Sequence, residues 1–204
     1  MTELTVKQLF EGRHKAIQNA CSLIEDAECL LESNRWSSAA FLAHIAIEEL
    51  GKYLMLVGAI GGVLDGSISW SIFWKRFLSH AQKSQNIFDF DAILSPSESP
   101  DEIGEDFEKA TADSQKYQQQ KLSALYVDFE KDAFVEPAKK VDENIAKGAV
   151  AGARSVLSFF EMGEREIFSK GDITSITPEK FRKVKEDFLM RSKDVFGAQQ
   201  GVQP

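Results

Sequence analysis

The chain has 204 residues, of which 43% are hydrophobic and 27% are charged, values typical of a globular domain. No segment near the N-terminus joins a basic start to an apolar core, and the longest apolar run, 50–64, is too interrupted for a membrane span. Cys21 and Cys29 lie eight residues apart on one predicted helix, too far for a disulfide bond. We therefore expect a cytoplasmic protein with reduced thiols and no membrane contact.

The net charge of −8 is unevenly distributed along the chain. Residues 96–113 contain seven acids and one base and so carry −6, whereas residues 66–88 contain three bases, one histidine and no acid. Because local charge governs contact with phosphate, the acidic total does not exclude RNA as a partner.

The first half of the chain predicts three helices. Apolar residues at spacings of three, four and seven predict an amphipathic helix over 4–32. Ser33-Asn34-Arg35 predicts a tight connection, followed by a mostly buried helix over 36–57 that ends near Gly58. A third helix is predicted over 69–90.

The second half also predicts helices, after an interruption. The Pro-, Ser- and acid-rich segment 95–113 predicts a mobile surface loop, with a helical turn as an option over 103–110. Helix is predicted again over 116–124, then a short extended piece over 125–129. Pro137 predicts the start of a long helix to about residue 168, and Pro178 that of a last helix to 196. No segment has convincing strand periodicity, so the predicted fold class is all-α, with one helical domain over residues 1–170 and a C-terminal helix and frayed tail over 171–204.

A charged cluster interrupts the apolar second helix. Between residues 36 and 64 the strongly ionisable side chains are His44, Glu48, Glu49 and Lys52. Buried charges are costly unless they are paired or take part in chemistry. We therefore expect this cluster to face the basic residues of the next helix, which are Arg76, His80 and Lys83.

On one continuous helix these three basic residues form a single cationic stripe. A histidine can take or return a proton near pH 7, and an arginine can hold a phosphate through two hydrogen bonds. That combination suits phosphodiester cleavage, with Glu48 or Glu49 orienting Arg76 or His80.

Several other interpretations remain open at this point. His44, Glu48 and His80 are candidates for a His/Glu metal site. The basic face is also consistent with non-catalytic binding of RNA, a ribosomal component or a nucleotide. A purely structural role would bury His80 in the core and pair Glu48 with Lys52, and the run 13–15 (Arg-His-Lys) is predicted to be solvated.

The segments 46–52 (AIEELGK) and 73–83 (FWKRFLSHAQK), followed by Leu125–Asp128 and Pro137, resemble the AbiV family of bacterial abortive-infection proteins, which belongs to the HEPN superfamily. The resemblance covers residues 9–153. It implies a HEPN-like antiparallel helical bundle with an extra C-terminal helix, a homodimer and a role in phage defence. HEPN ribonucleases usually carry an arginine, four to six residues and then a histidine. They cut RNA without a metal by activating the ribose 2′-hydroxyl, in a cleft built by two protomers. Here Arg76 and His80 are separated by three residues.

The expected function is therefore that of an anti-phage abortive-infection effector, a metal-independent endoribonuclease that shuts down translation and needs no cofactor. A phage-encoded activator or an inhibitory partner protein is expected to control it, and the acidic segment 95–113 is a candidate docking or regulatory element. The expected catalytic residues are a phosphate clamp, a general base or acid and two orienting carboxylates: Arg76, His80, Glu48 and Glu49. The expected RNA or phosphate contacts are Lys52, Lys83 and Tyr126.

Overall fold

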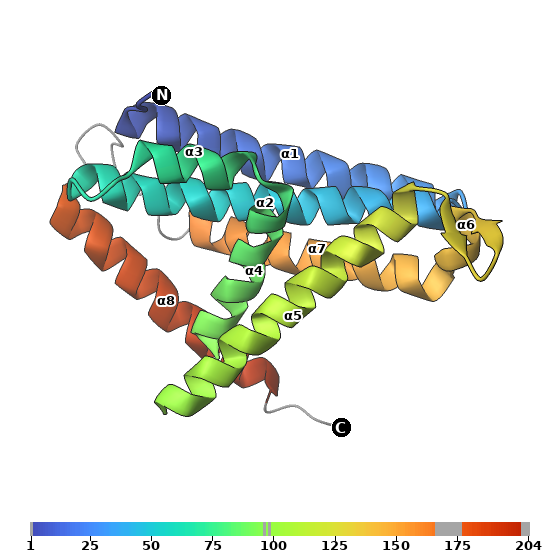
Figure 1. Ribbon diagram of the computed structural model, residues 1–204. Helices are drawn as coiled ribbons and strands as arrows, with labels where there is room; N and C mark the ends of the chain where they lie inside the picture. Colours follow the sequence, from blue (N-terminus) through green and yellow to red (C-terminus); the bar gives the residue numbers. More distant parts are fainter. Residues whose placement is uncertain (1, 96, 98, 166–176, 201–204) are drawn as a thin grey trace.

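The computed structural model describes residues 2–95, 97, 99–165 and 177–200. Within these ranges the chain forms eight helices and one small sheet, so the all-α prediction is confirmed (Figure 1). The helices are α1 Val6–Glu32, α2 Trp36–Leu64, α3 Trp70–Leu78, α4 His80–Leu94, α5 Pro100–Leu125, α6 Pro137–Lys140, α7 Glu143–Gly163 and α8 Pro178–Gln200; the strands are β1 Asp128–Glu130 and β2 Ala133–Val135. None of the helices in the described ranges has the length and apolar character needed to cross a membrane.

Helices α1 and α2 form an antiparallel hairpin that carries most of the core (Figure 1). The predicted tight connection is confirmed, because Asn34 takes the left-handed conformation (φ 56°) that reverses the chain. Small side chains line the contact and let the two helices approach closely: Ala16, Ala20 and Ala27 on α1, and Ala39, Ala43 and Ala46 on α2. Helix α7 packs against both through buried Leu157 and Phe160.

Helix α2 continues to Leu64, seven residues beyond the predicted end. The glycines after Val57 do not stop the helix but make room for neighbours. A Cβ at Gly61 would lie 3.2 Å from the Phe181 ring on α8, and one at Gly62 would lie 3.3 Å from Ile68.

The predicted single helix over 69–90 is wrong. It is divided into α3 and α4 at Ser79, whose backbone is extended (φ −83°, ψ 119°). The Ser79 N–H donates to the Arg76 carbonyl at the end of α3, and the Ser79 hydroxyl accepts a bond from the Gln82 N–H at the start of α4. One serine thus ends one helix and caps the next.

The loop prediction for 95–113 is wrong from Pro100 onward, because α5 begins there and runs for 26 residues. Ser99 and Glu102 form a capping box, and Pro100 occupies the first helical position. Helices α4 and α5 pack side by side and extend away from the α1–α2 hairpin, toward the C-terminal half of α8 (Figure 1).

The chain between α5 and α7 was predicted only in part. Strands β1 and β2 form an antiparallel hairpin whose two turn residues, Lys131 and Asp132, both have positive φ. The long helix predicted from Pro137 is divided at Val141 and Asp142, so that α6 is a single turn. Its predicted end near residue 168 lies outside the described residues, as does the tail from 201. Helix α8 begins at Pro178 as predicted and continues to Gln200.

Candidate functional site

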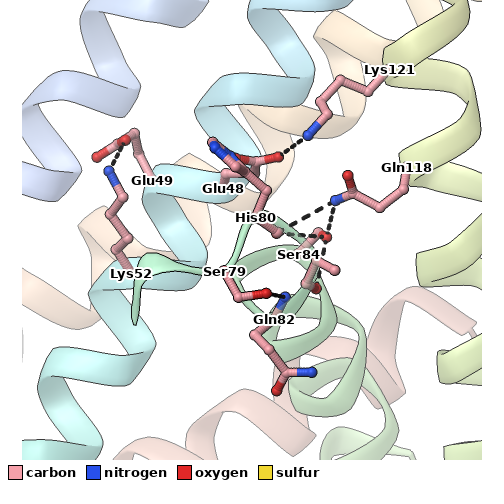
Figure 2. Close-up of polar contacts among 10 residues, drawn as sticks. Glu48, Glu49, Lys52, Ser79, His80, Gln82, Ser84, Gln118 and Lys121 are labelled. Carbon is pink, nitrogen blue, oxygen red and sulfur yellow. Dashed lines mark hydrogen bonds and ion pairs between the residues drawn. The ribbon is translucent and has the colours of Figure 1, made fainter. Parts of the chain in front are cut away.

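The carboxylate of Glu48 is the centre of a charged cluster between α2, α4 and α5 (Figure 2). Its side chain is only 3% exposed. One oxygen, Oε2, lies 2.6 Å from His80 Nδ1, and the other, Oε1, contacts the ammonium group of the buried Lys121. The expected pairing of a glutamate on the second helix with His80 is therefore present.

The buried carboxylate is ionised at neutral pH. Burial raises the pKa of Glu48, but the hydrogen bonds from Lys121 and His80 outweigh this effect, and the pKa lies below its usual value. An ionised carboxylate can only accept hydrogen bonds, so the neutral imidazole must carry its proton on Nδ1. The second ring nitrogen, Nε2, is then an acceptor with a free lone pair.

His80 is the first residue of α4, and its side chain is 67% exposed. The structural alternative, in which His80 is a core residue, is therefore wrong. An imidazole that is oriented on one side by a buried carboxylate and open to solvent on the other has the arrangement of a general base.

Two further lysines stand beside this pair. Lys52 bonds to Glu49, three residues earlier on α2 (Figure 2), so the alternative Glu48–Lys52 bridge is wrong. Lys83 lies one turn after His80 on α4 and is 6% exposed. Burial and the nearby Lys52 lower its pKa, against the opposite effect of Glu48 and Glu49. Within the described ranges Lys83 forms no ion pair.

The first turn of α4 is held in place by backbone contacts. A Cβ at Gly51 would lie 1.8 Å from the Lys83 carbonyl oxygen, so only glycine permits this approach of α4 to α2. From the other side, the Gln118 amide of α5 donates to Ser84 Oγ and to the His80 carbonyl (Figure 2). These contacts fix where the imidazole stands relative to Glu48.

Arg76 does not share a stripe with His80 and Lys83, and that prediction is wrong. Because the chain is extended at Ser79, Arg76 belongs to α3, and its guanidinium donates to Asn86 Oδ1 at 3.1 Å. Asn86 is six residues after His80, about 9 Å further along α4. Tyr126, the C-cap of α5, is 59% exposed and takes no part in the contacts found around Glu48 among the described residues.

The alternative metal site does not assemble. His44 is buried beside the Tyr117 ring, with centroids 4.2 Å apart, and burial and Lys121 lower its pKa to about 4. In the part of the chain that the structure describes, no group of three or more His, Cys, Asp or Glu side chains is placed to hold a metal ion.

Sequence reasoning missed Lys121, Gln118 and Ser84. Lys121 is one base in a Gln-rich stretch of the helix predicted over 116–124, and it lies 73 residues from Glu48. Nothing in the local pattern links the two residues. The carboxylate in an apolar helix was the available signal, because a buried charge requires a partner.

The solvated run predicted at 13–15 is wrong for Arg13, which is 4% exposed, whereas His14 and Lys15 are exposed. Arg13 Nη1 lies 2.6 Å from Oε1 of Glu164, the C-cap residue of α7, and the Tyr53 hydroxyl donates to the same oxygen at 2.7 Å. The guanidinium also lies over the rings of Phe10 and Tyr53. This second cluster ties α1, α2 and α7 together.

The fold and the site define a helical-bundle domain with an oriented, solvent-facing histidine. Residues 8–158 match the family model HEPN_AbiV, described as AbiV. The chain belongs to the AbiV family and is an abortive-infection protein of the HEPN type. Neither the curated proteins nor the solved structures contain a significant match.

Proposed function

We propose that this protein is a metal-independent endoribonuclease that stops translation in a phage-infected cell. The observation that carries the proposal is the exposed imidazole of His80, whose Nδ1 is bound to the buried carboxylate of Glu48. A histidine held in this way can accept a proton at Nε2 without help from a metal ion.

In the proposed reaction, His80 Nε2 takes the proton of a ribose 2′-hydroxyl. The 2′-oxygen attacks the adjacent phosphorus, and the bond from phosphorus to the 5′-oxygen of the next nucleotide breaks. The products are a 2′,3′-cyclic phosphate and a 5′-hydroxyl. The leaving oxygen needs a proton, and in the homodimer that we propose the imidazole of the second copy is the natural donor. Glu48 stabilises the imidazolium that forms on His80.

Cations are available to the phosphate in this proposal. Lys83 is one turn from His80 and Lys52 is close to it, so both are assigned as phosphate contacts. Arg76 would join them as a clamp by leaving Asn86, and Tyr126 would stack on a base further along the RNA. A phage-encoded activator or an inhibitory partner is proposed as the control, with the acidic half of α5 as its docking element.

A second candidate function is non-catalytic binding of RNA or a ribosomal component. The observation that favours it is the separation of Arg76 from His80, because the guanidinium is bound to Asn86 instead of standing beside the imidazole.

Incubation of the purified protein with RNA separates the two candidates. We expect fragments that end in 2′,3′-cyclic phosphate, and their loss in His80→Ala. The matched control is His14→Ala, since His14 is an exposed histidine on α1 outside the cluster. RNA binding by wild type with no fragments under activating conditions would favour the binding module.

A further inference from the structure

Two cavities lie apart from the cluster around Glu48. The first, of about 400 Å³, is open to solvent and is lined by α2, α3, α4 and residues 67–69. Its polar wall includes Arg76 and Asn86, and we call it the Arg76 cavity. The second, of about 670 Å³, lies between α2, α4, α5 and α8. Its wall is mainly apolar and includes four aromatic side chains, so we call it the phenylalanine cavity: Phe90, Phe107, Phe181 and Phe188. Both volumes lie within the range of small-molecule sites.

The two cavities are neighbours, because Leu54, Gly58 and Asn86 line both. Gly58 is exposed in the last third of α2, and a Cβ at this position would meet no atom within 4 Å. The space above Gly58 is therefore open between them.

The charges around this space favour an anion. Arg76 is bound by the neutral amide of Asn86, which leaves its positive charge uncompensated. On the opposite wall Arg182 and Lys185 project from α8, and within the described ranges neither forms an ion pair.

The acidic side chains of the wall are already engaged by neutral donors. Asp65 accepts hydrogen bonds from the Ser67 hydroxyl and N–H, and Asp89 accepts one from the Gln85 amide. The Ser67 hydrogen bonds, with a smaller contribution from the charge of Arg182, lower the pKa of Asp65. Asp65 therefore offsets Arg182 in part, and the anion is assigned to Arg76.

We infer that the two cavities form one binding site for a small amphipathic organic anion. Its apolar body lies among the phenylalanines, and its carboxylate, sulfonate or phosphate group binds Arg76 over Gly58. Arg76 is the one residue that this site shares with the proposed RNA contacts. The site uses neither His80 nor Glu48, so its ligand binding is measured without RNA and does not depend on cleavage.

Fluorescence titration with anilinonaphthalene sulfonate and its uncharged analogue N-phenylnaphthylamine tests the site. A leucine at Gly58 fills the shared space, so Gly58→Leu raises the Kd of both probes by about tenfold or more. The matched control is Gly148→Leu on α7, an exposed helical glycine whose Cβ would also meet nothing within 4 Å, and it leaves both Kd values unchanged. Neither variant lowers Tm, because leucine favours helix over glycine.

Arg76→Gln tests the charge. It raises the Kd of the sulfonate probe by about tenfold, the worth of one charge-assisted hydrogen bond, and leaves that of the uncharged probe unchanged. Absence of binding to wild type, or an equal response of the Gly58 and Gly148 variants, would overturn the site. An equal response of both probes to Arg76→Gln would overturn the assignment of the ligand as an anion.

Discussion

Among the described residues, two ion pairs contain a buried cation, and they differ in access. In the first, Glu48 is bound by Lys121 and by His80, whose ring is mostly exposed. In the second, Arg13 is bound to Glu164 under the rings of Phe10 and Tyr53, and burial raises the pKa of the Tyr53 hydroxyl far above its usual value. The residues named in the second cluster include no histidine, whereas the first cluster presents an imidazole to solvent.

The comparison shows that a buried charge is not by itself a sign of function. Both pairs join three helices, and both satisfy the requirement that a buried charge be paired. Of these two clusters, the one around Glu48 also contains a solvent-exposed imidazole, that of His80, which the buried carboxylate orients. We therefore expect substitution of His80 to reduce activity, and disruption of either ion pair to reduce stability.

The largest expected effect is on RNA cleavage, and it distinguishes the two clusters. His80→Ala lowers RNA cleavage by about 10²–10⁴-fold, the usual worth of a general base, with little change in the urea midpoint because the side chain is exposed. Arg13→Met does the opposite: it lowers the urea midpoint and leaves cleavage per folded molecule unchanged. Parallel cleavage assays and urea titrations check both. A large loss of cleavage by folded Arg13→Met would contradict the division.

The next effect is on stability at the Glu48 cluster. Glu48→Leu leaves the Lys121 charge buried without a carboxylate, so the free energy of unfolding falls by about 3–5 kcal/mol. The double variant Glu48→Leu/Lys121→Met removes both charges and recovers most of that loss. Urea unfolding of the single and double variants measures the recovery. A double variant as unstable as Glu48→Leu would show that Lys121 is not the partner that matters.

A smaller effect concerns the backbone that positions His80. Gly51→Ala forces the Lys83 carbonyl away from α2 and lowers the free energy of unfolding by about 1–3 kcal/mol. Gly148→Ala, at a helical glycine with open space, raises it by about 0.5–1 kcal/mol. Equilibrium unfolding should give opposite signs for these two substitutions. Equal effects would mean that α4 can move back from α2 without cost.

The smallest effect is a dependence on pH. The pKa of Glu48 is lowered in the folded protein, so its ionised form adds stability above the pKa of the unfolded chain, and this stability is lost as pH falls through the folded value. The stability difference between wild type and Glu48→Leu should therefore shrink as pH falls below the usual glutamate range. Urea unfolding at a series of acidic pH values tests this, and a constant difference would contradict it.

The sequence predicted those elements whose signals are local. Apolar periodicity predicted α1 and α2, and Pro178 marked the start of α8. The capping box of Ser99 and Glu102 around Pro100 was an equally local signal, but the acidic composition obscured it. The break at Ser79 had no such signal, because serine is tolerated within a helix and becomes a cap only when the next helix takes another direction.

The candidate site was predicted in part for the same reason. The isolated charges of α2 required a partner, and this brought Glu48 and His80 together correctly. Lys121 and the Gly51 contact depend on how α5 and α4 approach α2, and that approach is set by side chains spread over the whole bundle. Arg76 was misplaced because its spacing to His80 was measured along a helix that ends between them.

Because the backbone is extended at Ser79, the number of residues between Arg76 and His80 does not determine how their side chains are placed relative to each other. The imidazole is located by what lies after it, since the first turn of α4 is fixed against Gly51 and Gln118. The arginine is located by α3, on the other side of the joint. Residues inserted or removed ahead of Ser79 would therefore move the guanidinium and leave the imidazole on its carboxylate. In this protein the count of intervening residues reports how far Arg76 stands from the break at Ser79, and it does not report the shape of the cluster at Glu48.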